Sequence, residues 1–164
     1  METLQFVMQD FKKQLEKGVL QQAYKGLMEY ILWLKSHLKN KYPEYTVSGS
    51  IYYGFMDMTY FSFTPGSLKK RDLKIAIVFN YDAFRFEVWL AGVNKQVGRE
   101  YWELIRKSGW NKYRLVSSVK EADGIVEHIL VPDPDFSDLD SLTMKIEQGT
   151  LSFISDIEEQ LSSL

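Results

Sequence analysis

Three charged residues, Asp57, Asp72 and Lys74, have the types and the order that metal-dependent nucleases use. Such an enzyme holds Mg²⁺ with one acid and with a second acid that lies two residues before a lysine on an adjacent strand. In a strand, Asp72 and Lys74 share one face because they are two residues apart. Acid-x-lysine triplets also arise by chance, and Asp10-Phe11-Lys12 is a second example. The simpler interpretation of these residues is therefore a set of solvated charges at strand ends.

A stronger pattern covers residues 73–91, and it predicts a β-hairpin. Apolar residues alternate with a second set of residues on both sides of the polar break Asn80-Tyr81-Asp82-Ala83. Period-two alternation places each set on its own side of a sheet. One side is wholly apolar, and we expect Phe84 and Phe86 to lie on it. The other side, called here the mixed face, carries Lys74, Arg85, Glu87 and Trp89.

The mixed face is the candidate binding surface. Pairing Phe79 with Phe84 across the hairpin would set Lys74 opposite Trp89 and Val78 opposite Arg85. The small residues Ala76 and Ala91 would then leave a shallow floor beside the indole ring. Arginine and tryptophan are frequent anchors of binding surfaces. The alternative is a sheet face half covered by a helix, in which Arg85 and Glu87 simply pair with each other.

Other motifs that carry chemistry are sparse in this sequence. The two histidines, His37 and His128, lack the spacing of a zinc site, and we interpret both as structural residues. Neither glycine-rich phosphate motif is present. The basic turn 65–71 could hold an anion, although a solvated loop is the simpler interpretation. We therefore predict no metal and no cofactor.

The elements that must position these residues follow from periodicity and from turn signals. Apolar stripes at steps of three and four predict helices, and β-branched and aromatic runs predict strands. Gly49 and Gly54 interrupt one such run and indicate a bulge or a close backbone approach. Met56-Asp57 divides that run into two short strands or bends a single strand. The predicted helices are 3–17, 20–41, 95–107 and 137 to the C-terminus, with Ser137 as the last N-cap, and the predicted strand regions are 45–63, 73–91, 113–116 and 125–131.

This order, α-α-β-β-β-α-β-β-α, predicts an α+β fold. Strands joined by short turns pair antiparallel, and helices separate from an antiparallel sheet in this fold class. We expect a single domain over residues 1–164, with an antiparallel sheet of four or five strands and helices mainly on one face.

Composition restricts the function further. The formal net charge is −2, which argues against nucleic acid as a partner because that affinity needs clustered lysine and arginine. Cysteine is absent, so disulfides, thiolate metal sites and thiol nucleophiles are excluded. No signal peptide or membrane-spanning run is evident. We expect a soluble, cytoplasmic protein that does not bind membranes.

Five segments carry a resemblance to known sequences, namely residues 24–31, 42–45, 48–61, 84–92 and 134–140. They resemble a bacterial family of uncharacterised proteins, a domain of unknown function. The resemblance covers nearly the whole chain and implies a bacterial origin and a single domain. It brings no activity, cofactor or catalytic residue with it.

The function that these observations favour is a non-catalytic cytoplasmic binding or interaction protein that uses the mixed face. Its partner is a protein or a small molecule, and the aromatic content of 15% suits self-association as a homodimer. The alternative is a metal-dependent nuclease or phosphodiesterase that uses Asp57, Asp72 and Lys74.

Overall fold

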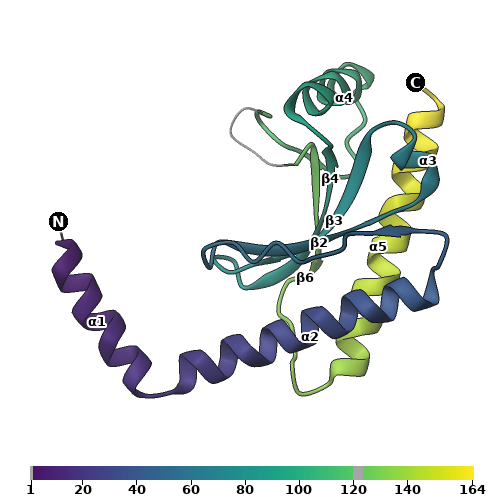
Figure 1. The fold of residues 1–164 in the computed structure, drawn as a ribbon. Coiled ribbons are helices and arrows are strands. Elements are labelled where there is room, and N and C mark those ends of the chain that lie inside the picture. Colours follow the sequence, from purple (N-terminus) through teal and green to yellow (C-terminus); the bar gives the residue numbers. More distant parts are fainter. Residues whose placement is uncertain (1, 120–123) are drawn as a thin grey trace. The chain divides into compact units, whose positions relative to one another are not determined.

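The computed structural model describes residues 2–119 and 124–164 (Figure 1). The chain divides into two compact units, residues 1–37 and 38–164, so the single domain over 1–164 stays a prediction. The first unit holds helix α1 (Leu4–Glu16) and most of helix α2 (Val19–Lys41). The hydroxyl of Thr3 caps α1 by accepting a hydrogen bond from the backbone N–H of Phe6 at 3.2 Å. The last turn of α2 and all of the later elements belong to the second unit.

The second unit is built on one antiparallel sheet with the strand order β1-β2-β3-β4-β6-β5. The predicted α+β class and the antiparallel pairing are therefore confirmed. In the described part of the chain the sheet has six strands, because the run 45–63 separates into two strands around the turn that contains Gly54. The strands are β1 (Thr46–Val47), β2 (Met58–Thr64), β3 (Leu73–Asn80), β4 (Arg85–Gly92), β5 (Arg114–Leu115) and β6 (Val126–Val131).

The 73–91 hairpin is confirmed, but its predicted register is wrong by two residues. Phe79 pairs with Phe86 and not with Phe84. The connection includes Phe84, which has a φ of 52° and is 57% exposed. The amide oxygen of Asn80 accepts a hydrogen bond from the backbone N–H of Ala83 at 3.1 Å and so stabilises the longer turn. A shift by two residues keeps every side chain on its face, so only the pairs across the hairpin change.

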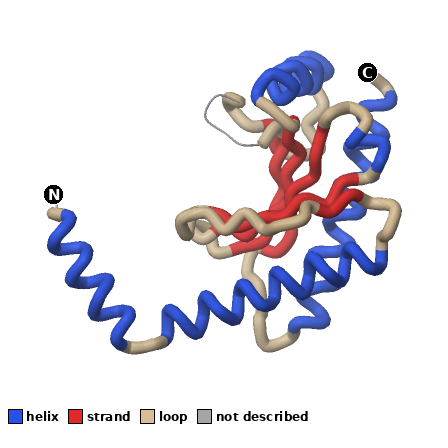
Figure 2. The backbone as a smooth tube through the Cα atoms, viewed as in Figure 1, coloured by secondary structure: helices blue, strands red, loops and turns tan. Residues whose placement is uncertain are grey.

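The apolar face of the hairpin forms the centre of the core. Apart from Phe84, its side chains are 2% exposed or less: Leu73, Ile75, Ile77, Phe79, Phe86, Val88 and Leu90. Helix α5 (Leu139–Ser162) packs against β6 and β4 (Figure 2). Its N-cap is Asp138 and not Ser137, because the Asp138 carboxylate accepts from the backbone N–H of Ser141 at 3.1 Å. Ser137 instead donates to Asp135 in the preceding turn.

Helix α4 (Lys95–Ser108) follows directly from the end of β4 and contacts β4 and β5. Asn94 caps it, with its side-chain oxygen accepting from the backbone N–H of Val97 at 2.9 Å. The indole N–H of Trp102 donates to the carbonyl of Val116 at 2.7 Å and ties the middle of α4 to the chain after β5. The short helix α3 (Gly66–Lys69) occupies the region predicted as a turn. Within residues 2–119 and 124–164, no helix has the length and apolar character needed to cross a membrane.

Candidate functional site

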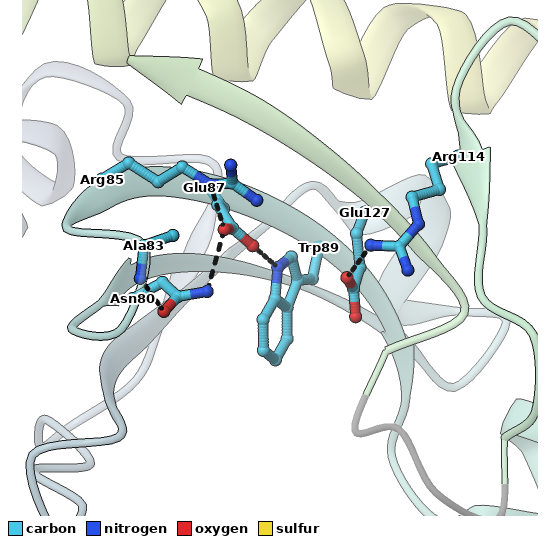
Figure 3. Close-up of polar contacts among 7 residues, drawn as sticks. All are labelled: Asn80, Ala83, Arg85, Glu87, Trp89, Arg114 and Glu127. Carbon is cyan, nitrogen blue, oxygen red and sulfur yellow. Dashed lines mark hydrogen bonds and ion pairs between the residues drawn. The ribbon is translucent and has the colours of Figure 1, made fainter. Parts of the chain in front are cut away.

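A buried carboxylate organises the mixed face. Glu87 has a side chain that is only 4% exposed, although it lies in the middle of β4. One of its oxygens accepts from Nε of Arg85 at 2.7 Å and from the amide nitrogen of Asn80 at 3.1 Å. The other oxygen accepts from the indole N–H of Trp89 at 2.8 Å. Figure 3 shows all three donors converging on this carboxylate.

The alternation of β4 explains this arrangement. Arg85, Glu87 and Trp89 are each two residues apart, so their side chains leave the strand on the same side and lie next to one another. The register sets Asn80 opposite Arg85, which brings its amide group to the same carboxylate. A buried charge is costly unless it is paired and fully hydrogen-bonded. The three donors meet that requirement, and in return they fix the orientation of the Trp89 ring.

A cavity of about 190 Å³ opens beside Trp89 on the same face. Its walls are mainly apolar and aromatic, and its cationic groups come from Lys74 and Lys95. The ammonium of Lys74 lies 5.7 Å from the centre of the Tyr60 ring, a cation–π distance. The lining residues are Tyr60, Lys74, Ala76, Trp89, Ala91, Gly92, Val93, Asn94, Lys95, Gly98, Val119 and Ile125.

The first turn of α4 closes one side of this cavity. A Cβ atom on Gly92 would lie 2.5 Å from the backbone nitrogen of Gly98 and 2.8 Å from the carbonyl oxygen of Asn94. The helix can therefore approach the end of β4 this closely only because residue 92 is a glycine. Lys95 also lines the cavity, and its ammonium donates to the carbonyl of Val119 at 3.3 Å.

The structure places all four predicted binding residues on one face of the hairpin. Lys74 and Trp89 line the cavity, whereas Arg85 and Glu87 form the polar support behind the indole. The alternative interpretation of this face is confirmed in one respect, because Arg85 and Glu87 do pair with each other. The use of the face as a binding surface stays a prediction. Small residues do form the floor, since Ala76 and Ala91 line the cavity.

Tyr60, Lys95 and Gly98 line the cavity but were not predicted from the sequence. Tyr60 pairs with Val78 in the β2–β3 register and so shares the mixed face. The alternation of residues 58–64 is a signal that could have found it. The positions of Lys95 and Gly98 at the cavity depend on how α4 packs against β4. No local sequence pattern predicts that packing.

The proposed nuclease residues do not come together. Asp57 directly precedes β2, whose first residue pairs with Asn80 at the far end of β3. Lys74 and Asp72 lie six and eight residues before Asn80, or about 20 and 26 Å along the strand at roughly 3.3 Å per residue. One ion cannot be shared across that separation, since its ligand distances are about 2.0–2.6 Å. Among the described residues, no three acidic or histidine side chains gather as a metal site.

Asp57 has a structural role in its turn instead. Its Oδ1 accepts from the backbone N–H groups of Phe55 at 2.9 Å and Met58 at 2.8 Å. The hydrogen bond from Phe55, followed by that from Met58, lowers the pKa of the Asp57 carboxyl below its usual value. The carboxylate is therefore held ionised to stabilise the turn before β2.

The remaining candidates also have structural contacts. His37 stacks on Trp33 at 5.0 Å between ring centres, within the first unit. His128 pairs with Val88 and so lies on the apolar face, where it stacks parallel to Phe153. In the basic turn, Lys69 donates to the hydroxyl of Thr46 at 3.3 Å.

His128 predicts a pH dependence of stability. Burial lowers the pKa of His128 below its usual value of 6.5, so the unfolded chain takes up the proton first as the pH falls. The contribution of His128 to stability is present above about pH 6.5 and is lost as the pH falls towards the lowered pKa. We expect His128→Gln to reduce the decline in the free energy of unfolding between about pH 7 and pH 5, measured by urea unfolding.

Tyr113→Phe is the matched control for this experiment. It keeps the ring that lies edge-on to His128 but removes the hydroxyl that donates to Asp156. That hydrogen bond is the largest cause that lowers the pKa of Asp156 from 3.8, so its loss acts at more acid pH. The control should show the same decline in the free energy of unfolding between about pH 7 and pH 5 as the wild type. A His128→Gln variant with an undiminished decline would contradict the prediction.

A family model described as Domain of unknown function (DUF7000) matches residues 4–161. Searches of curated proteins and of solved structures gave no match.

Proposed function

Since this chain belongs to the DUF7000 family, whose description names no activity, we propose a function from the geometry of the mixed face: the protein is a non-catalytic binding protein. Its ligand occupies the cavity beside Trp89, between Lys74 and the first turn of α4. We place it in a bacterial cytoplasm. The cysteine-free sequence suits a reducing compartment, and the resemblance of its segments supports a bacterial origin.

The observation that carries this proposal is the fixed indole of Trp89. The ring borders a cavity, and its N–H is held by a carboxylate that is itself almost fully buried. A sheet face that needed only to be covered would not require a buried charge with three donors. Binding sites gain affinity when the groups that contact the ligand are held in place beforehand.

A thermal-shift screen of small metabolites, followed by calorimetry of the hits, tests the proposal. Trp89→Phe keeps a ring but cannot donate to Glu87, and Arg85→Ala removes the strongest partner of that carboxylate. We expect each variant to bind the hits about tenfold more weakly, a loss of roughly 1.4 kcal/mol in binding free energy. Lys145→Ala, at an exposed position on α5, is the control and should bind as the wild type does. A screen without hits, or hits that bind both variants as tightly as the wild type, would refute the proposal.

A further inference from the structure

We infer that the cavity beside Trp89 takes a small organic anion, with a planar ring between Tyr60 and Trp89 and its anionic group at Lys74. This inference rests on the proposed function and adds the chemical class of the ligand. It depends on three properties of the cavity, namely its charge, its wall chemistry and its size.

The charged groups among the described residues that line the cavity are all cationic. Lys74 and Lys95 both line it, and no acidic residue is among the described residues that do. The Lys74 ammonium contacts the Tyr60 ring, which leaves its hydrogen-bond donors available to a ligand. Glu87 lies behind the indole and is already occupied by its three donors. An anionic group is therefore the natural partner of Lys74.

The walls favour an aromatic body over a bare inorganic ion. Tyr60, which stacks on Tyr52 at 5.0 Å between ring centres, and Trp89 contribute aromatic rings to the lining, and alanine, valine and isoleucine side chains supply its aliphatic part. Rings stack on such surfaces in offset or edge-to-face arrangements. Apolar walls also lower the local dielectric constant, which strengthens the attraction between Lys74 and an anion.

The size of the cavity limits the ligand to about one ring. Drug-sized ligands occupy pockets of roughly 300–1,000 Å³, whereas this cavity measures about 190 Å³. An apolar cavity of about 150 Å³ holds benzene. A single ring with one carboxylate or phosphate therefore matches the available space.

The test is an NMR titration that follows the indole N–H signal of Trp89, identified by its loss in Trp89→Phe. Four probes are used: benzoate, phenyl phosphate, the neutral analogue benzamide and inorganic phosphate. We expect one or both aromatic anions to bind at least tenfold more tightly than benzamide or inorganic phosphate, with each Kd taken from the shift of this signal. Which of the two anions binds more tightly separates a carboxylate ligand from a phosphate ligand.

Charge removal at single positions identifies the group that holds the anion. Lys74→Gln should weaken binding of the preferred aromatic anion about tenfold and leave the affinity for benzamide unchanged. Lys107→Gln, an exposed position at the other end of α4, is the matched control and should change neither. Because the attraction is electrostatic, binding should also weaken with added salt.

Two results would overturn the inference, and they differ in what they mean for the proposed function. Equally tight binding of benzamide and the aromatic anions, measured by the shift of the Trp89 signal, would refute the anionic class of ligand and leave a ligand site in this cavity. No shift of the Trp89 signal by any probe at about 10 mM would exclude binding even at a Kd near 1 mM. That result refutes the inference, and the metabolite screen then decides the proposed function separately.

Discussion

Arg85→Met is expected to lower the free energy of unfolding by about 3 kcal/mol, because removal of one partner from a buried ion pair leaves an uncompensated charge. The Glu87 side chain is 4% exposed, so its carboxylate cannot recover hydration once the guanidinium is gone. Trp89 and Asn80 would remain as its donors, but both are neutral. Urea unfolding followed by circular dichroism measures the loss.

A double-mutant cycle separates this effect from ordinary loss of packing. Arg85→Met combined with Glu87→Leu removes both charges, and we expect at least half of the loss to be recovered. Arg114→Met is the matched control, since Arg114 pairs with Glu127 on the same sheet at 3.5 Å but is 71% exposed (Figure 3). Glu127 is 18% exposed, but solvent screens the attraction to a guanidinium that lies mostly in water, so we expect Arg114→Met to cost only about 0–1 kcal/mol. Equal losses in Arg85→Met and Arg114→Met, or strict additivity in the cycle, would show that Glu87 is not a buried charge.

Gly54→Ala should be the other strongly destabilising change, with a loss of about 2–5 kcal/mol. Gly54 has a φ of +71°, and a left-handed conformation costs a residue with a side chain about 1–2 kcal/mol. An added Cβ would also lie 2.1 Å from the carbonyl oxygen of Met58, a backbone atom that cannot move without disturbing the start of β2. Displacement of that kind adds about 1–3 kcal/mol.

Gly109→Ala isolates the contribution of the clash. Gly109 has nearly the same φ, +74°, but a Cβ there would meet nothing within 4 Å. This control should lose only the conformational cost of about 1–2 kcal/mol. Thermal and urea unfolding of both variants give the difference. Equal losses would mean that the turn before β2 relaxes freely around the new methyl group.

The predicted close backbone approach at Gly54 was therefore correct, whereas a Cβ added to Gly49 would meet nothing within 4 Å. The difference is not visible in the sequence, because both glycines interrupt the same aromatic run. Only the return of the chain at Met58 against residue 54 decides which of them a side chain would obstruct. The sequence therefore predicted an irregular backbone in this run, but only the tertiary contact shows that Gly54 is the residue that must be a glycine.

The faces of the hairpin could be predicted, and its register could not. Alternation fixes which side each residue takes, so Lys74, Arg85, Glu87 and Trp89 were assigned to one surface correctly. Register depends on the conformation of the turn, and the left-handed φ of Phe84 lengthened that turn beyond the polar break. The pairing of Asn80 with Arg85, which completes the support of Glu87, followed from this shift.

The cavity itself depended on contacts between distant segments. Its walls come from β2, β3, β4, the start of α4 and the two residues Val119 and Ile125. The same limitation explains the failed metal hypothesis. The order of Asp57, Asp72 and Lys74 along the chain was right for a nuclease, but antiparallel pairing of β2 with β3 put Asp57 at the far end. Sequence order alone does not say which ends of two strands meet.

The most direct test of the central claim is a chemical-shift map of the ¹⁵N-labelled protein with the strongest ligand from the metabolite screen. A ligand held against the Glu87-supported indole should produce its largest changes at the Trp89 side-chain N–H and at the backbone amides of Gly92 and Gly98. Changes that instead gather around Trp110 and Asp156, which line a separate cavity of about 260 Å³, would contradict it.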